Sequence, residues 1–136
     1  MKLFVFLFFF IPVAGKINIH SQNSELPYIK VEGEVTQSLK LYQSDLNTMK
    51  RVTVSHKGHD SITNSYTGVS LIEILSLAGV TMGKQLRGKE LAKYLLVSAA
   101  DGYQVVFSLA EIDSSFNEKT IILADKKDGN PIPVNP

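Results

Sequence analysis

The chain has 136 residues, of which 44% are hydrophobic and 20% are charged, and these values are typical of an ordinary globular domain. Its formal net charge is +1, and no stretch is rich in arginine or mixes basic with aromatic residues, so we expect no nucleic-acid partner. The absence of cysteine excludes disulfides, thiolate metal sites and cysteine nucleophiles.

The first fifteen residues have the pattern of a secretory signal peptide. Lys2 precedes an apolar run over residues 3–11, and small residues lead up to Gly15. The run is shorter than the ~20 apolar residues that cross a bilayer. We therefore predict cleavage of residues 1–15, with a cut as late as residue 22 as an alternative, and a periplasmic or secreted protein without a stable membrane span. An uncleaved membrane anchor is the competing interpretation.

The segment that follows is expected to begin with an exposed lead-in and to continue into two strands. Residues 16–27 are polar and irregular. Apolar and polar residues then alternate over 28–35, which predicts a half-buried strand with Ile29 and Val31 on its inner face. Leu39 and Leu41 alternate with polar neighbours in the same way and predict a second, short strand.

A short helix and a hairpin are expected next. Ser44 is a suitable N-cap for a helix that carries Leu46 inward. Alternation over 52–55, the turn-like run 57–60, and a returning pattern from Ile62 to Tyr66 predict two antiparallel strands.

The clearest helix is predicted to begin at Ser70. Ser70 and Glu73 have the spacing of a capping box, and Gly79 is a natural left-handed terminator. The inner face of this helix is formed by Leu71, Ile74, Leu75 and Ala78. A weaker helix is expected over 89–93.

The remaining pattern alternates strands with short elements. Residues 94–100 are apolar on both faces, as in a central strand, and Asp101-Gly102 predicts a tight turn into a strand over 103–107. Ser108 and Glu111 form a second capping-box pair. A buried strand is expected over 120–124, and a turn follows at Asp128-Gly129. Strands and short helices without a regular alternation of long helices predict an α+β fold with a mixed sheet.

Three stretches, taken in order, resemble the molybdopterin-binding oxidoreductase domain of the sulfite oxidase family. They are residues 66–80, with Gly-Val before a Leu-rich helix that ends in Ala-Gly; residues 99–113, with Asp-Gly-Tyr and a short helix; and residues 121–133, with Leu-Ala followed by Gly-Asn-Pro. The resemblance spans residues 28–136. It implies a sulfite oxidase-like α+β fold around a molybdopterin site, and catalytic members of the family transfer oxygen at molybdenum.

The resemblance also implies two departures from the family pattern. The family's cysteine ligand to molybdenum ends the strand before the Gly-Val helix, and His56 stands at about that place here. An imidazole is a different ligand from a thiolate. Family members continue past the position of Pro136 with a Gly-Pro-x-Arg segment, so the domain over 28–136 is expected to be shortened at its C-terminal end.

Four residues are the candidate site residues. His56 and His59 are candidate metal ligands, with a polar hairpin tip as the alternative. His56, Asp101 and Tyr103 are candidate contacts to a molybdopterin cofactor. For Asp101 and Tyr103 the alternative is a tight turn followed by a packed ring.

Three functional hypotheses remain open. The first is an exported, non-catalytic module that keeps the molybdopterin-domain fold and binds a small molecule or a periplasmic protein partner. The second is a molybdenum-cofactor-dependent oxidoreductase, or a subunit of one. The third is a structural or interaction domain with no small ligand.

Overall fold

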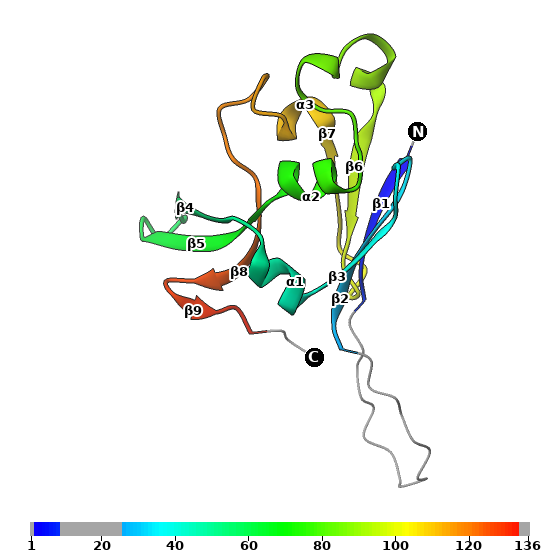
Figure 1. Cartoon of the computed structure of the whole chain (residues 1–136). Helices are drawn as coiled ribbons and strands as arrows, with labels where there is room; N and C mark the ends of the chain where they lie inside the picture. Colours follow the sequence, from blue (N-terminus) through cyan, green and yellow to red (C-terminus); the bar gives the residue numbers. More distant parts are fainter. Residues whose placement is uncertain (1, 9–25, 134–136) are drawn as a thin grey trace, which may run out of the picture.

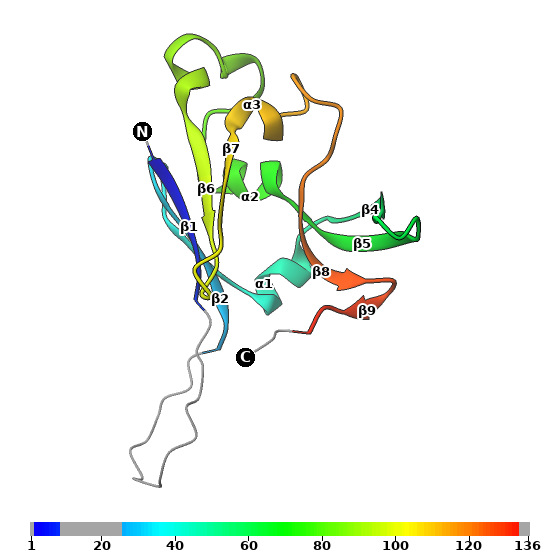
Figure 2. The same cartoon turned by 180° about the vertical axis from the view of Figure 1, so that it is seen from behind.

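The computed structural model describes residues 2–8 and 26–133. It contains two β-sheets with short helices between them (Figures 1 and 2). The strands of the first sheet are β1 Lys2–Phe8, β2 Tyr28–Gly33, β3 Leu39–Tyr42, β6 Tyr94–Ser98 and β7 Gln104–Ser108. The strands of the second are β4 Arg51–Lys57, β5 Thr63–Ser70, β8 Ile122–Lys127 and β9 Asn130–Pro131. We call them sheet A, with the order β3-β2-β1-β6-β7, and sheet B, with the order β4-β5-β8-β9.

The pairing within the sheets makes the fold α+β with a mixed sheet, as the sequence predicts in general terms. In sheet A, β1 runs parallel to β6, whereas β2 pairs antiparallel with β1 and β3, and β7 pairs antiparallel with β6. The pairs of sheet B are all antiparallel. The predicted alternation of β2 is confirmed, because Ile29 and Val31 are buried while Lys30 and Glu32 are only partly covered.

The position of β1 is the least expected feature of the fold. Residues 2–8 belong to the segment predicted to be a signal peptide, yet they form the middle strand of sheet A. Val5 lies opposite Val31 of β2 on one side and opposite Val97 of β6 on the other. Residues 9–15 and the predicted lead-in up to residue 25 lie outside the described residues. Cleavage of the segment stays a prediction.

Sheet B contains the predicted hairpin. β4 and β5 pair from Arg51 opposite Val69 to Lys57 opposite Thr63. A register shift in the pairing of β5 with β8 falls between Thr67 and Gly68. Gly68 has no room for a side chain there, since an added Cβ would lie 1.9 Å from the carbonyl oxygen of Leu123.

Three short α-helices follow strands directly: α1 Gln43–Thr48, α2 Leu71–Leu77 and α3 Leu109–Ile112. The capping box of α3 is confirmed: the backbone amide of Ser108 donates to Glu111 at 2.7 Å, and the amide of Glu111 donates to the Ser108 hydroxyl at 3.2 Å. The backbone amide and the hydroxyl of Ser108 both donate to the Glu111 carboxylate and hold its pKa below the ordinary value. Two 3₁₀ turns, η1 Gly83–Gln85 and η2 Gly88–Ala92, lie between α2 and β6, so the helix predicted over 89–93 is a 3₁₀ turn.

One predicted helix cap is wrong, and the other, Ser70 at the N-cap of α2, is right in position but forms no capping box. The N-cap of α1 is Tyr42 rather than Ser44, and the Tyr42 amide donates to Asp45 at 2.7 Å. The Ser70 side chain makes no capping hydrogen bond to α2. Glu73 instead accepts a hydrogen bond of 3.3 Å from the amide of Lys50, the residue that precedes β4.

The core lies between sheet A and the helices. Its fully or nearly buried side chains in the described chain are Ile29, Val31, Leu41, Leu46, Val69, Ile74, Leu75, Ala78, Leu86, Leu95, Leu109 and Ile112. The predicted inner face of α2 is confirmed through Ile74, Leu75 and Ala78. Gly79 ends this helix with φ +78°, and an added Cβ would lie 2.4 Å from the Thr36 hydroxyl.

A buried carboxylate ties the end of α3 to η1. Asp113 is 0% exposed, and its carboxylate accepts hydrogen bonds from the backbone amide of Ser115 at 2.8 Å and from that of Gly83. Burial alone would raise the pKa of Asp113. The hydrogen bonds from the two amides outweigh burial and hold the pKa below its ordinary value.

Candidate functional site

The two candidate metal ligands lie at the end of the β4–β5 hairpin. His56 is exposed on β4, opposite Asn64, at the edge of sheet B. His59 is exposed in the turn, which is closed by a hydrogen bond of 2.9 Å from the Gly58 amide to the Ile62 carbonyl. Nowhere in residues 2–8 or 26–133 do three or more His, Cys, Asp or Glu side chains gather into a group able to hold a metal ion. The turn between β4 and β5 is also held by a hydrogen bond of 3.0 Å from the Ile62 amide to the Asp60 side chain.

The candidate cofactor contacts lie in sheet A. Asp101 closes the β6–β7 turn, because its side chain accepts a hydrogen bond of 2.9 Å from the Tyr103 amide, and Gly102 has φ +88°. The Tyr103 side chain is 66% exposed. This turn lies apart from the β4–β5 hairpin in both views (Figures 1 and 2). The structure therefore does not bring His56 together with Asp101 and Tyr103.

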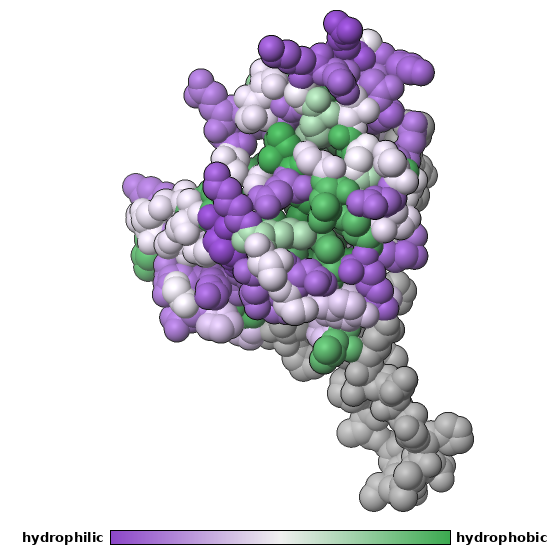
Figure 3. All heavy atoms as spheres, viewed as in Figure 1, coloured by the Kyte–Doolittle hydropathy of each residue, from purple (hydrophilic) through white to green (hydrophobic). Residues whose placement is uncertain are grey.

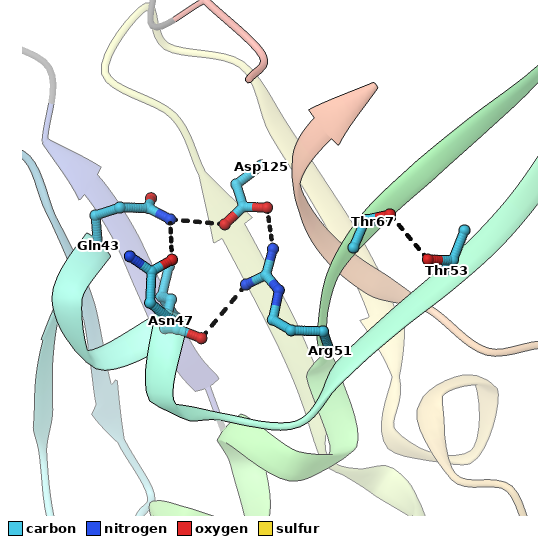
Figure 4. Close-up of polar contacts among 7 residues, drawn as sticks. Gln43, Asn47, Arg51, Thr53, Thr67 and Asp125 are labelled. Carbon is cyan, nitrogen blue, oxygen red and sulfur yellow. Dashed lines mark hydrogen bonds and ion pairs between the residues drawn. The ribbon is translucent and has the colours of Figure 1, made fainter. Parts of the chain in front are cut away.

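A polar network that the sequence does not reveal connects α1, β4 and β8 (Figure 4). Arg51 of β4 forms an ion pair with Asp125 of β8, and its other terminal nitrogen donates to the Leu46 carbonyl at 3.3 Å. The side-chain amide of Gln43 donates to Asp125 at 2.7 Å and to Asn47 at 3.1 Å. Burial opposes ionisation of Asp125, but the hydrogen bonds from Gln43 and Arg51 hold its pKa below the ordinary value.

In this network the positive charge of Arg51 is paired with a carboxylate of the same chain. The chain has two arginines, Arg51 and Arg87. The side chain of Arg51 is 27% exposed and that of Asp125 is 15% exposed, so the pair is largely shielded from water. Arg87, between η1 and η2, is exposed. A phosphate group near sheet B would therefore have to compete with Asp125 for Arg51.

A small hollow beside η2 contains charges that already pair with one another. It measures about 230 Å³ and is lined by Glu34, Lys89, Glu90, Ala92 and Lys93. Lys93 forms ion pairs with Glu90 and, at 3.3 Å, with Glu34. The hydrogen bond to Glu90 is the main reason that the pKa of Lys93 is raised. Ligand pockets usually measure roughly 300–1,000 Å³, so this hollow is smaller than a typical cofactor site.

One face of the molecule carries an apolar area. Figure 3 shows apolar side chains gathered near the centre of that face, over α2, with polar residues around them. Leu77, the last residue of α2, is 46% exposed. Exposed apolar areas rimmed by polar side chains are typical of surfaces that bind other molecules. None of the helices in the described chain is both long and apolar enough to span a membrane.

Comparison with known proteins gives no assignment for this arrangement. No model of a known protein family matches the chain. No curated protein matches it either.

Proposed function

We propose that this chain is an exported, non-catalytic binding module with a molybdopterin-domain-like fold, and that its ligand is a partner protein. The observation that carries the proposal is the state of the residues that would have to hold a molybdenum cofactor. The chain has no thiolate, and His56, at the corresponding place, is an exposed residue of an edge strand. A metal held through one exposed imidazole would lack the strong anionic ligand that sulfur provides.

Two cationic side chains that could bind the phosphate group of a pterin are already paired within the fold. Arg51 is paired with Asp125 and with the Leu46 carbonyl, and Lys93 is paired with Glu90 and Glu34. Releasing either cation for a phosphate would leave a partly covered carboxylate unpaired, which carries its own energetic cost. These residues therefore do not fit a molybdopterin group, and we derive no redox step through it.

The apolar area over α2 favours a protein over a small polar molecule as the ligand (Figure 3). Leu77, the last residue of α2, is 46% exposed, and the residues of α2 that face inward are buried. A contiguous exposed apolar area with a polar rim is more typical of protein-binding surfaces than of sites for small polar ligands.

Metal analysis of the protein tests the proposal. The full chain is produced in a host that makes molybdopterin and is supplied with molybdate, and molybdenum per folded chain is measured after purification. We expect far less than one molybdenum per chain. A value near one, with oxygen transfer that depends on that metal, would refute the proposal. The His56→Ala variant is the matched control, because a metal held by His56 must disappear with the imidazole.

A further inference from the structure

The middle of sheet A is filled by a strand that export is predicted to remove. β1 lies between β2 and β6, antiparallel to the first and parallel to the second (Figures 1 and 2). Its six pairs with β2 run from Leu3 opposite Gly33 to Phe8 opposite Tyr28. Neighbouring strands lie about 4.8 Å apart, so removal of β1 leaves two facing strand edges about 10 Å from each other.

We call the gap that β1 would leave between β2 and β6 the slot. This slot is unfavourable when it is empty. Both edges carry backbone N–H and C=O groups that pair with β1, and unpaired edges of this kind attract other strands. The side chains of the two bordering strands are also part of the core: Val31 of β2 and Leu95 of β6 are both 0% exposed. Losing the middle strand would bring water to these positions and cost hydrophobic free energy.

We propose that, in the exported protein, this slot binds an extended apolar segment of a partner protein, which takes the place of β1. The inference rests on the proposed binding function and names the chemistry of the partner. The partner segment has about seven residues, the length of β1. It is apolar on both faces, as a central strand must be, and has no proline in its interior.

The slot also fixes the direction of the partner segment. The segment must run parallel to β6 and antiparallel to β2, because the two bordering strands already have these directions relative to β1. The mode of binding is strand addition, in which the backbone hydrogen bonds supply affinity and the side-chain positions supply specificity. A segment that runs the other way would meet β2 in parallel and β6 in antiparallel pairing, and would lose the observed register.

The test begins from the full chain. A recognition sequence for a specific protease is inserted after Gly15. The protein is produced without export, folded and cut, and the released residues 1–15 are separated from it in denaturant before it is refolded. The cut protein is mixed with a fluorescent peptide of residues 2–8, made soluble by lysines at both ends. We expect saturable binding of one peptide per chain. The same peptide with Val5→Pro should bind about tenfold or more weakly, because proline has no N–H for a strand that is bonded at both edges.

The two peptides have the same length and charge and differ at one residue, which in one of them has no N–H to pair. Equal binding of both peptides would mean that the cut protein binds apolar peptides without forming strand hydrogen bonds. This result would overturn the proposal. Absence of binding by either peptide would mean that the slot closes, and would also overturn it. A cut protein that dimerises and binds no peptide would assign the slot to a second copy rather than to a different partner, with the same consequence for the proposal.

A cross-linking arm tests the register, because a chain without cysteine gives no background disulfides. Opposed residues of an antiparallel pair have Cα atoms about 4.5–5.5 Å apart, within the reach of a disulfide. A peptide with Val5→Cys should cross-link to Val31→Cys in the cut protein but not to Glu34→Cys, which lies beyond β2. Equal cross-linking to both positions would contradict the register.

A second cysteine pair covers the case in which a cysteine at the buried Val31 prevents folding. Phe6 lies opposite Lys30, whose side chain is 41% exposed, so the pair Phe6→Cys and Lys30→Cys leaves the buried Val31 unchanged. Failure of the inference and failure of the proposed function remain distinguishable. Bound molybdenum refutes the proposed function whatever the peptide does, whereas a metal-free protein that captures no strand refutes the inference alone.

Discussion

The buried carboxylate of Asp113 allows a quantitative prediction. Asp113→Ala removes the acceptor of two backbone amides, those of Gly83 and Ser115. Gly83 is half-buried, so its amide would remain without a partner at a cost of about 1–3 kcal/mol. Ser115 is exposed, and water can replace the lost acceptor for less than about 1 kcal/mol. We therefore expect a loss of about 1–4 kcal/mol in the free energy of unfolding.

The matched control is Asp101→Ala. Both aspartates accept a hydrogen bond from the amide two residues later, at 2.8 Å for Asp113 and 2.9 Å for Asp101. Asp101 is exposed, so its replacement should cost about 0.5 kcal/mol or less. Urea unfolding followed by circular dichroism measures both values by linear extrapolation. If the two folded variants lose the same stability, burial of the Asp113 carboxylate is not the reason for its effect, and the reasoning fails.

Asp113→Ala should also change how the stability of the protein depends on pH. The folded-state pKa of Asp113 lies below the ordinary value of 3.8. The carboxylate therefore contributes stability that is fully present above the unfolded-state pKa and is lost as the pH falls through the folded-state pKa. The difference between the parent chain and Asp113→Ala should be constant from about pH 5 to 7 and should shrink below about pH 4. A difference that grows on acidification would contradict the sign.

Three further predictions concern packing, turn geometry and the polar network. Leu75→Ala should lower the free energy of unfolding by about 2–5 kcal/mol because Leu75 is 1% exposed, whereas Leu77→Ala, at 46% exposed, should cost less than about 1 kcal/mol in the same urea assay; equal costs would contradict the burial. Gly79→Ala should cost more in thermal unfolding than Gly102→Ala, although both have positive φ, because only Gly79 lacks space for a Cβ. Arg51→Met should destabilise the fold by about 1–3 kcal/mol by leaving its carboxylate partner unpaired, and unchanged stability on titration with urea would show that the ion pair contributes nothing.

Much of the local structure follows from the sequence. Alternation of side chains predicts β2 and the β4–β5 hairpin, because the burial of one face imposes a period of two residues. Gly79 predicts the end of α2, because its left-handed conformation excludes most other residues. The Ser108–Glu111 box is likewise predictable, since both of its partners lie within one turn.

Features that depend on distant partners are not predictable in this way. Ser70 and Glu73 have the spacing of a capping box, but the Leu71 amide donates to the Ile121 carbonyl at 3.0 Å and Glu73 turns to Lys50. Nothing in the local pattern indicates these tertiary competitors. For the same reason the pairing of Arg51 with Asp125 is visible only after folding.

The candidate site shows the same limit more strongly. The sequence predicts the turns that hold His59 and Asp101, but not that they lie in different sheets. An apolar run at the start of the chain satisfies the requirements of a signal peptide and those of a central strand equally, because both need continuous hydrophobicity. Periodicity alone therefore does not distinguish the role of residues 2–8.

The parallel pairing of β1 with β6 also has a consequence for the order of folding. Leu3 lies opposite Leu95, so the two strands meet only after most of the chain has been synthesised and a long loop has closed. Contacts between such distant segments form slowly compared with hairpins. Residues 2–8 therefore cannot complete their pairing in sheet A until residues 94–98 have been made, and in the export that we propose this delay would keep the apolar segment accessible for translocation.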